Sequence, residues 1–297
     1  MLISIIIRTL NESLHLAELL QKINGQECSL GSTEVVVIDS GSTDDTLSIA
    51  EAFNCNITHI TKRDFTFGRS LNEGCEYSSG EILVFISGHC IPCDKHWLEN
   101  LVSPIAQGLV DYSYGRQVGR DTTKFSEQEL FKKYFPDESQ TPQEGFFVNN
   151  ANSAIRRSSW RKFKFDESLT GLEDLDLAKR LVADCGRVGY CSDASVYHIH
   201  DEKWSQTLRR YEREAYALQT IMPEIHVNAV DMLRYIFVGI INDAVQAVRQ
   251  KVFLSEIVGI VRFRVAQYFG TYRGNHLHRT VSRERKENYF YPRANKK

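Results

Sequence analysis

Between residues 2 and about 115, short apolar runs alternate with longer stretches of helical periodicity, and this alternation narrows the folds open to the chain. The strand-like runs are residues 3–8, 34–38, 57–60 and 82–86, and the helical stretches are residues 14–23, 46–53 and 97–106. Strands joined by helices of about ten residues form right-handed crossovers within a largely parallel sheet. Ligands bind such sheets beyond the carboxyl ends of the strands, so the residues just after each run are the first candidates for a site.

The middle of the chain extends this α/β pattern. Residues 116–146 are polar and contain one amphipathic candidate helix, residues 127–135. They predict either a loop and short helix over the site or a plain surface insertion. Residues 147–200 return to mixed strand and helix, with a helix expected at 173–181 and a strand at 194–199.

The last part of the chain predicts helices. After Pro223, residues 227–249 and 252–269 form two long amphipathic stretches. Charged residues interrupt the first, so no run reaches the roughly 18 apolar residues that a membrane-spanning helix needs. We therefore predict one α/β domain over residues 1–222 and a helical extension over residues 223–297.

Composition and charge add limits of their own. The chain is 42% hydrophobic and 25% charged, which is typical of a globular protein and excludes a disordered or fibrous one. Residues 203–297 hold 17 Lys and Arg against 8 Asp and Glu, whereas residues 1–202 hold 19 against 30. A basic, amphipathic tail favours peripheral binding to an anionic membrane surface. Packing on the first domain, or on a second subunit in a homo-oligomer, is the alternative.

The first residues of the chain and the cysteines indicate the cellular compartment in which the protein is expected. The apolar run at residues 2–7 turns polar at once, which predicts a buried strand rather than a signal peptide. Seven cysteines are an odd number, which favours reduced thiols in a cytoplasmic protein.

A buried strand ends in a carboxylate at Asp39, and the residues that follow have small side chains up to Asp44. A carboxylate at a strand end can accept hydrogen bonds from a base or a ribose, and Gly41 allows close approach of the backbone. The alternative is an ordinary turn in which Asp44 or Asp45 caps the next helix.

Taken with Thr9-Leu10-Asn11-Glu12, the segment Asp39-Ser40-Gly41-Ser42-Thr43-Asp44 resembles the donor-binding half of family 2 glycosyltransferases. The resemblance covers about residues 1–215 and implies the GT-A fold, a mixed and mainly parallel sheet flanked by helices. It also implies which residues surround the nucleotide sugar. These are Thr9, Asn11, Glu12, Asp39, Ser42, Asp44, Arg69, Ser87 and Gly88. Of these, Arg69 can form a bidentate pair with a phosphate.

The family's metal motif, Asp-x-Asp, is replaced here by Ser87-Gly88-His89. An imidazole binds Mn²⁺ more readily than Mg²⁺, which prefers oxygen ligands. Some members of the family use a late histidine as a further ligand, and His198 or His200 is in that place. Three outcomes are open: a divalent cation held by His89 with His198, a metal-independent site that relies on Arg and Lys, and an inactive protein.

A second group of polar residues, Asn150, Asn152, Glu173 and Asp174, comes later in the chain. A carboxylate at a helix start can take the proton of an attacking hydroxyl, although acidic residues there also stabilise the helix dipole. By resemblance to the acceptor-side Glu-Asp motif, Asp174 is the catalytic base and Glu173 helps to place the acceptor. The two asparagines would contact the donor sugar or the acceptor.

The resemblance thus implies an enzyme that transfers a sugar, with inversion, from a nucleotide-sugar donor to a hydroxyl of a glycan or lipid-linked acceptor. The context implied is cell-surface polysaccharide or glycolipid synthesis in the cytoplasm, at the inner face of the membrane, with no nucleic acid as partner. Two rivals stay open: a nucleotidyltransferase, and a non-catalytic partner in a glycan-assembly complex. The segment 8–12 lacks the glycine-rich loop that a nucleotidyltransferase normally carries.

Overall fold

The computed structural model describes residues 1–277 and residue 289, and these fall into two compact units. The first unit comprises residues 1–120, 131–168 and 173–199, and the second comprises residues 121–130, 169–172 and the described part of 200–297. The domain boundary that we predicted between residues 222 and 223 stays a prediction.

Among the described residues, eight strands of the first unit form one mixed sheet in the order β3-β2-β1-β4-β7-β6-β8-β5. The strands are β1 (Leu2–Thr9), β2 (Ser32–Asp39), β3 (Asn56–His59), β4 (Ile82–Ser87), β5 (Cys90–Pro92), β6 (Tyr112–Val118), β7 (Asn152–Arg156) and β8 (Val188–His198). Strands β3, β2, β1 and β4 are parallel, whereas β7 is antiparallel to both β4 and β6. The predicted α/β fold with a mixed, mainly parallel sheet is confirmed.

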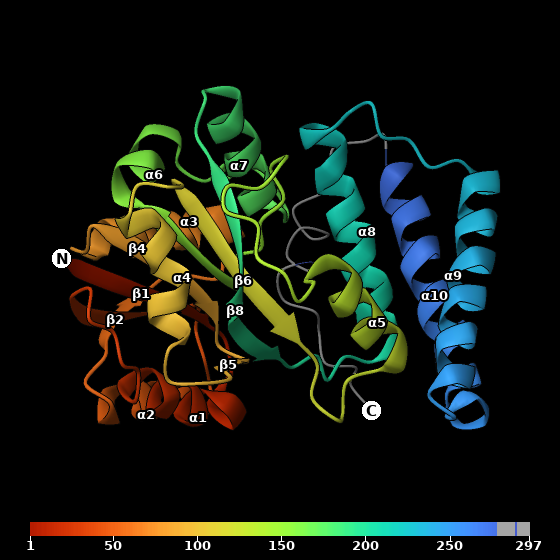
Figure 1. Cartoon of the computed structure of the whole chain (residues 1–297), viewed down its shortest axis with the longest axis horizontal. Helices are drawn as coiled ribbons and strands as arrows, with labels where there is room; N and C mark the ends of the chain where they lie inside the picture. The colour runs from red at the N-terminus through yellow and green to blue at the C-terminus, as the bar shows by residue number, and fades with distance from the viewer. Residues whose placement is uncertain (278–288, 290–297) are drawn as a thin grey trace. The chain divides into compact units, whose positions relative to one another are not determined.

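The sheet is covered on both faces. The helices of this unit are α1 (Ser13–Asn24), α2 (Thr46–Ala52), α3 (Phe67–Tyr77), α4 (Trp97–Ala106), α6 (Arg157–Phe163) and α7 (Glu173–Ala183). Side chains of β1 at alternate positions, such as Ile5, pack in one core with Leu16 and Leu20 of α1. On the other face, α3 approaches so closely that a Cβ on Gly74 would lie 2.9 Å from Ile6 Cγ2. Figure 1 shows α1 and α2 on one side of β1 and α3 on the other.

The parallel register brings three strand ends to one edge of the sheet. Thr9 of β1 pairs with Asp39 of β2, and Arg8 pairs with Ser87 of β4. The turns that follow these residues therefore lie next to one another, as expected for a parallel sheet.

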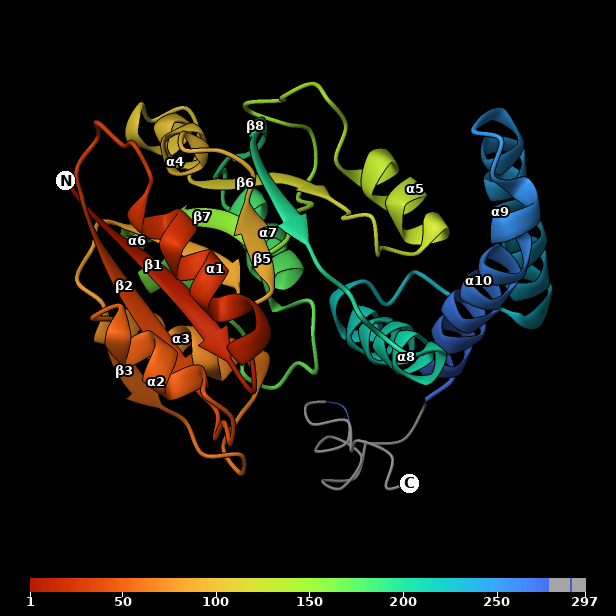
Figure 2. The same cartoon turned by 90° about the horizontal axis from the view of Figure 1, so that it is seen from below.

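The second unit is helical. It contains α8 (Trp204–Ile221), α9 (Ala229–Arg249), α10 (Phe253–Asn275) and the first residues of α5 (Phe125–Tyr134). Helix α10 packs against both α8 and α9, so it lies between them (Figures 1 and 2). The two predicted helices at residues 227–249 and 252–269 are present as α9 and α10. Among the described residues, no helix combines the length and the apolarity needed to cross a bilayer.

Candidate active site

The turns after β1 and β2 are joined by hydrogen bonds. Thr9 Oγ1 donates to Asp39 Oδ1 at 3.2 Å. The other oxygen of Asp39 accepts from the backbone N–H groups of Gly41 and Ser42, at 2.8 and 2.9 Å. Gly41 has a φ of +95°, a conformation that favours glycine. The Asp39 carboxylate is almost fully buried, so it fixes the shape of the turn on which a ligand would rest.

Asn11 and Asp44 strengthen this connection. The N–H of Asn11 donates to Ser42 Oγ at 2.8 Å, and Asp44 accepts from the Ser13 N–H and from Thr46 Oγ1. Burial opposes the ionisation of Asp44, but the hydrogen bonds from Ser13 and Thr46 outweigh it and hold the pKa of this carboxyl at about 2. Asp44 is therefore ionised at neutral pH and ties the start of α1 to the start of α2.

The Ser87-Gly88-His89 segment lies against Glu12. A Cβ on Gly88 would lie 2.9 Å from Glu12 Cγ, so a larger residue at this position would push the Glu12 side chain away. The adjacent His89 has its Nδ1 3.1 Å from Glu12 Oε1. The structure thus brings together a carboxylate and an imidazole, both of which bind divalent cations.

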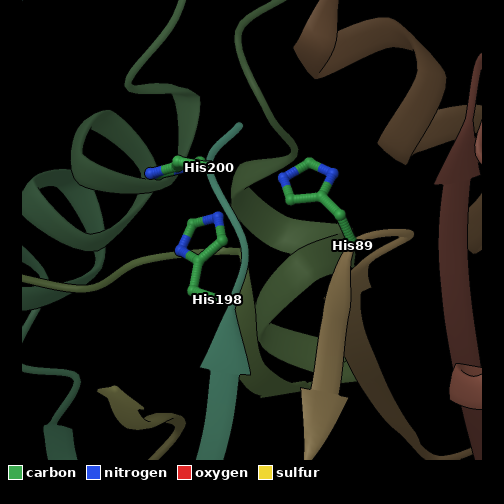
Figure 3. A group of neighbouring side chains, drawn as sticks. All are labelled: His89, His198 and His200. Carbon is green, nitrogen blue, oxygen red and sulfur yellow. The ribbon is translucent and has the colours of Figure 1, made fainter. Parts of the chain in front are cut away.

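His198 at the end of β8 faces His89. The two ring centroids are 5.3 Å apart and the ring planes meet at 22° (Figure 3). His198 Nδ1 lies 2.6 Å from Gln117 Oε1. Because that oxygen can only accept, Nδ1 donates to it, which leaves Nε2 as the ring nitrogen that could bind a metal. Metal-binding histidines are commonly oriented by a hydrogen bond of this kind.

His200 follows His198 by two residues and begins the last segment of the second unit. Peptide geometry alone keeps the Cα atoms of these two residues within about 7 Å of each other. The Nδ1 atom of His200 lies 2.8 Å from Glu127 Oε1, and the same oxygen lies 2.6 Å from Arg210 Nη2. One possible ligand atom from each of His89, His198 and His200 lies within 4.8 Å of the others (Figure 3).

Two arginines lie near the start of α3. Arg69 pairs with Glu73 through Nε, at 3.0 Å, and its side chain is 43% exposed. Arg8 was not singled out from the sequence, because it ends an apolar run that predicts only a strand. Its guanidinium lies 4.9 Å from the centre of the Phe67 ring, and its Nη1 lies 3.3 Å from Glu173 Oε1. Arg8 therefore links the end of β1 to the acidic start of α7.

Glu173 and Asp174 are both buried in the first turn of α7. The carboxylate of Asp174 accepts from the backbone N–H of Asn150 and of Leu175, each at 2.8 Å. Burial, and then the neighbouring charge of Glu173, raise the pKa of Asp174 to about 7, although both hydrogen bonds and Arg8 act in the opposite direction. A carboxyl that titrates near neutral pH is suited to exchange protons during catalysis.

The two asparagines occupy different environments. Asn150 Oδ1 accepts from the Tyr112 hydroxyl at 2.5 Å, and its Nδ2 is buried with no hydrogen-bond partner among the described residues. A bound ligand or water commonly satisfies such a donor. Asn152 is fully buried, accepts from Trp97 Nε1 and donates to the Ala194 carbonyl. Contact of either residue with sugar or acceptor stays a prediction.

The structure brings most of the predicted site residues into two groups. Thr9, Asn11, Asp39, Ser42 and Asp44 form the joined turns, and Glu12, Gly88, His89 and His198 lie together. Gln117 carried no signal in the sequence. Only the fold reveals that it contacts His198.

Comparison with known proteins places these features in a family. The family model for glycosyl transferase family 2 matches residues 4–163. The O-antigen chain rhamnosyltransferase WbaN of Salmonella anatum is 27% identical over 191 residues, which is 60% of this chain and 60% of that protein. RfbN of Salmonella typhimurium, also an O-antigen chain rhamnosyltransferase, is 26% identical over 71% of this chain and 70% of its own length. The alignments thus cover roughly two thirds of these relatives.

Solved structures resemble the whole described fold. TarS 1–349 of S. aureus, in complex with UDP-GlcNAc, has a TM-score of 0.56 and 17% identity, covering 94% of this chain and 93% of that one. The mannosyltransferase PcManGT of Pyrobaculum calidifontis, in complex with GDP-Man and Mn²⁺, has a TM-score of 0.58 and 17% identity, covering 92% and 72%. At this identity the likeness shows the fold, which is the GT-A fold.

Proposed function

This chain belongs to glycosyl transferase family 2, and we propose that it moves a sugar from a nucleotide-sugar donor to an acceptor hydroxyl with inversion. One observation carries the proposal: Glu173 and Asp174 form a buried carboxyl pair at the start of α7, and Arg8 links this pair to the end of β1. The match to the family and the acidic pair of α7 favour a transferase over a nucleotidyltransferase or a non-catalytic partner.

Asp174 is the base in this proposal. The acceptor oxygen forms a bond to the anomeric carbon of the sugar, the bond from that carbon to the diphosphate oxygen breaks, and the hydroxyl proton passes to Asp174. A base works best when its pKa is near the working pH. Glu173 raises the pKa of Asp174, and its ion pair with Arg8 holds it toward the end of β1. We therefore assign Glu173 to acceptor placement and Arg8 to positioning Glu173.

The joined turns after β1 and β2 are the proposed nucleotide site. Asp39 and Thr9 lie at strand ends, where ligands of parallel sheets bind, and Asn11, Ser42 and Asp44 hold the two turns in one shape. A rigid binding surface lowers the entropy cost of binding a flexible nucleotide. Arg69, with an exposed side chain on α3, is the proposed partner of the donor phosphates.

The residues around His89 fit a divalent cation. Imidazoles with a nearby carboxylate, and a ring oriented by Gln117, are a donor set that suits Mn²⁺ better than Mg²⁺. We propose that His89 and His198 hold this ion, with Glu12 beside His89 and with Ser87 and Gly88 close to the diphosphate. Such an ion would neutralise charge on the leaving diphosphate.

The metal proposal is tested by activity with and without a chelator. We expect EDTA to abolish transfer, Mn²⁺ to restore it better than Mg²⁺, and His89→Ala to lose most of the rate. His96→Ala is the matched control, because His96 directly precedes α4 and is half exposed. Full activity of the wild type in EDTA would leave a metal-independent site that relies on its cationic side chains.

The names of the relatives guide the choice of the acceptor and the donor sugar to test. Because two of them are named as O-antigen chain rhamnosyltransferases, we propose a glycan or lipid-linked acceptor in cell-surface polysaccharide synthesis, and a nucleotide-linked rhamnose as the first donor to test. We further propose that residues 1–222 form the catalytic domain, which works in the cytoplasm at the inner face of the membrane. Residues 223–297 are the extension that binds this membrane, and oligomerisation through it is the competing role.

A screen of nucleotide sugars tests the proposed function. Purified protein is heated with dTDP-, UDP-, GDP- and CMP-sugars, and the donor that raises the melting temperature is then used for turnover. We expect one nucleotide class to stabilise the protein and to be consumed when an acceptor is added. Stabilisation without turnover under any metal condition would favour the non-catalytic rival.

A further inference from the structure

Helices α9 and α10 of the second unit bury charged side chains between them and expose apolar side chains. The most deeply buried charged residues of the pair face each other between the helices: Arg264 donates to both carboxylate oxygens of Asp243, at 2.7 and 2.6 Å. Both side chains are at least nine-tenths buried. A helix pair that faces only water places charges outward and apolar side chains inward.

The outward side of α9 is apolar along its whole length. Exposed apolar side chains recur every three or four residues, which puts them on one stripe of the helix. They are Val230, Leu233, Phe237, Ile241, Val245 and Val248, and their exposed fractions run from 44% to 73%. Buried Gly239, Asp243 and Ala247 lie on the opposite side of the helix, which faces α10.

Helix α10 carries a second stripe of exposed apolar residues. Its exposed apolar residues are Leu254, Val258, Val261, Val265 and Phe269, with Leu254 exposed by 89%. A hollow of about 400 Å³ on α9 is lined by Ile241, Ala244, Val245, Val248 and Arg249. Isolated exposed apolar residues are common, but two such stripes on packed helices mark a docking surface.

The charged residues near these stripes indicate whether a second copy of the chain or an anionic surface binds there. The exposed charged residues of α9, α10 and the turn between them are all basic: Arg234, Arg249, Lys251, Arg262 and Arg273. The acidic residues of the two helices are half-buried, as for Asp231 and Glu256, or paired inside, as for Asp243. Self-association through this face would bring like charges together, whereas an anionic surface complements them.

We propose that the exposed apolar stripes of α9 and α10 insert into the acyl boundary of an anionic lipid bilayer, with the basic residues among the headgroups. Helix α9 has 21 residues and is therefore about 32 Å long, and no described helix combines the length and the apolarity needed to cross a bilayer, so an interfacial position is the one that fits its amphipathic pattern. This proposal adds a binding surface to the membrane location proposed above. Its test does not require catalysis, so its result is independent of whether the protein transfers a sugar.

The test is co-sedimentation of the full chain with vesicles of phosphatidylcholine, with or without phosphatidylglycerol. We expect binding at low salt to vesicles that contain phosphatidylglycerol, and weaker binding as salt rises, because the Debye length falls to about 3 Å at 1 M. The double variant Leu233→Ser/Phe237→Ser should weaken partitioning about tenfold or more, because it removes two exposed apolar anchors.

Two further variants serve as controls. Leu14→Ser changes a leucine that is more exposed than Leu233, 79% against 62%, on α1 of the first unit, and should leave vesicle binding unchanged. Arg234→Gln/Arg249→Gln should reduce binding only to vesicles that contain phosphatidylglycerol. Circular dichroism verifies that each variant keeps its helices, and sedimentation velocity measures its oligomeric state.

Three results would overturn the proposal. One is a wild-type protein that ignores phosphatidylglycerol vesicles at low salt. Another is vesicle binding that the Leu233→Ser/Phe237→Ser variant retains in full, which would move the contact elsewhere. The third is a stable dimer that this variant dissociates, in a protein that does not bind vesicles, which would assign the surface to a second copy of the chain.

Discussion

Replacing Asp174 by asparagine should make the protein more stable at alkaline pH, although it removes the proposed base. In the unfolded chain this carboxyl ionises near its ordinary pKa of 3.8, whereas burial and Glu173 raise the pKa in the folded state to about 7. Between these values the unfolded state releases a proton that the folded state keeps. The contribution of Asp174 to stability therefore falls as pH rises from about 4 to about 7.

The size of the effect follows from the two pKa values. Each pKa unit corresponds to about 1.4 kcal/mol, so the raised pKa lowers the free energy of unfolding by about 4 kcal/mol at pH 8 and by about 1.7 kcal/mol at pH 5. Asparagine can keep the hydrogen bond from the Asn150 N–H but loses the one from the Leu175 N–H, at a cost of about 1–2 kcal/mol. Asp174→Asn should thus be nearly neutral at pH 5 and stabilising by about 2–3 kcal/mol at pH 8.

Urea unfolding of wild type and variant at both pH values measures this difference directly. Asp176→Asn is the control, because Asp176 lies on the same helix but pairs with Arg180 near the surface and should show no gain at pH 8. If the advantage of Asp174→Asn does not grow between pH 5 and pH 8, the carboxyl is not kept protonated by its surroundings and the reasoning is wrong.

Other substitutions test separate parts of the structure. Asp243→Ala should destabilise the protein by about 3–5 kcal/mol in urea unfolding, because it leaves Arg264 buried and unpaired; an effect under 1 kcal/mol would mean that the pair is not desolvated. Gly74→Ala should cost about 1–3 kcal/mol and lower the melting temperature, since the new Cβ meets Ile6. Asp39→Ala should weaken nucleotide binding at least tenfold by calorimetry, and unchanged affinity would remove Asp39 from the donor site.

The sequence predicts the first half of the sheet well because its periodicity is unambiguous. The runs that became β1, β2 and β4 are apolar on both faces, as strands covered by helices on both sides must be. Periodicity does not predict helix α3. It contains Gly68 and Gly74, which have poor helix propensity but are needed where the backbone of Asp166 and the side chain of Ile6 come close.

Residue types alone could not assign the polar groups of the candidate site. Asn152 and Asn150 look alike in the sequence, yet the amide of Asn152 bonds inside the core, whereas Asn150 keeps a buried donor without a partner among the described residues. Arg8 and Gln117 contact Glu173 and His198, which are distant in the chain. Such pairings depend on how strands are ordered in the sheet, and local sequence patterns do not specify that order.

The central claim is that Asp174 takes the proton of the acceptor hydroxyl during sugar transfer. The most direct measurement compares wild type and Asp174→Asn for release of nucleoside diphosphate in the presence of acceptor, with donor affinity measured on the same samples. The proposed role predicts turnover lowered by about 10²–10⁴-fold, with donor affinity within a few-fold of wild type. It also predicts a wild-type rate that rises through pH 7, because the carboxyl must lose its proton to act. Full turnover by the variant would contradict the claim and move the base to another residue.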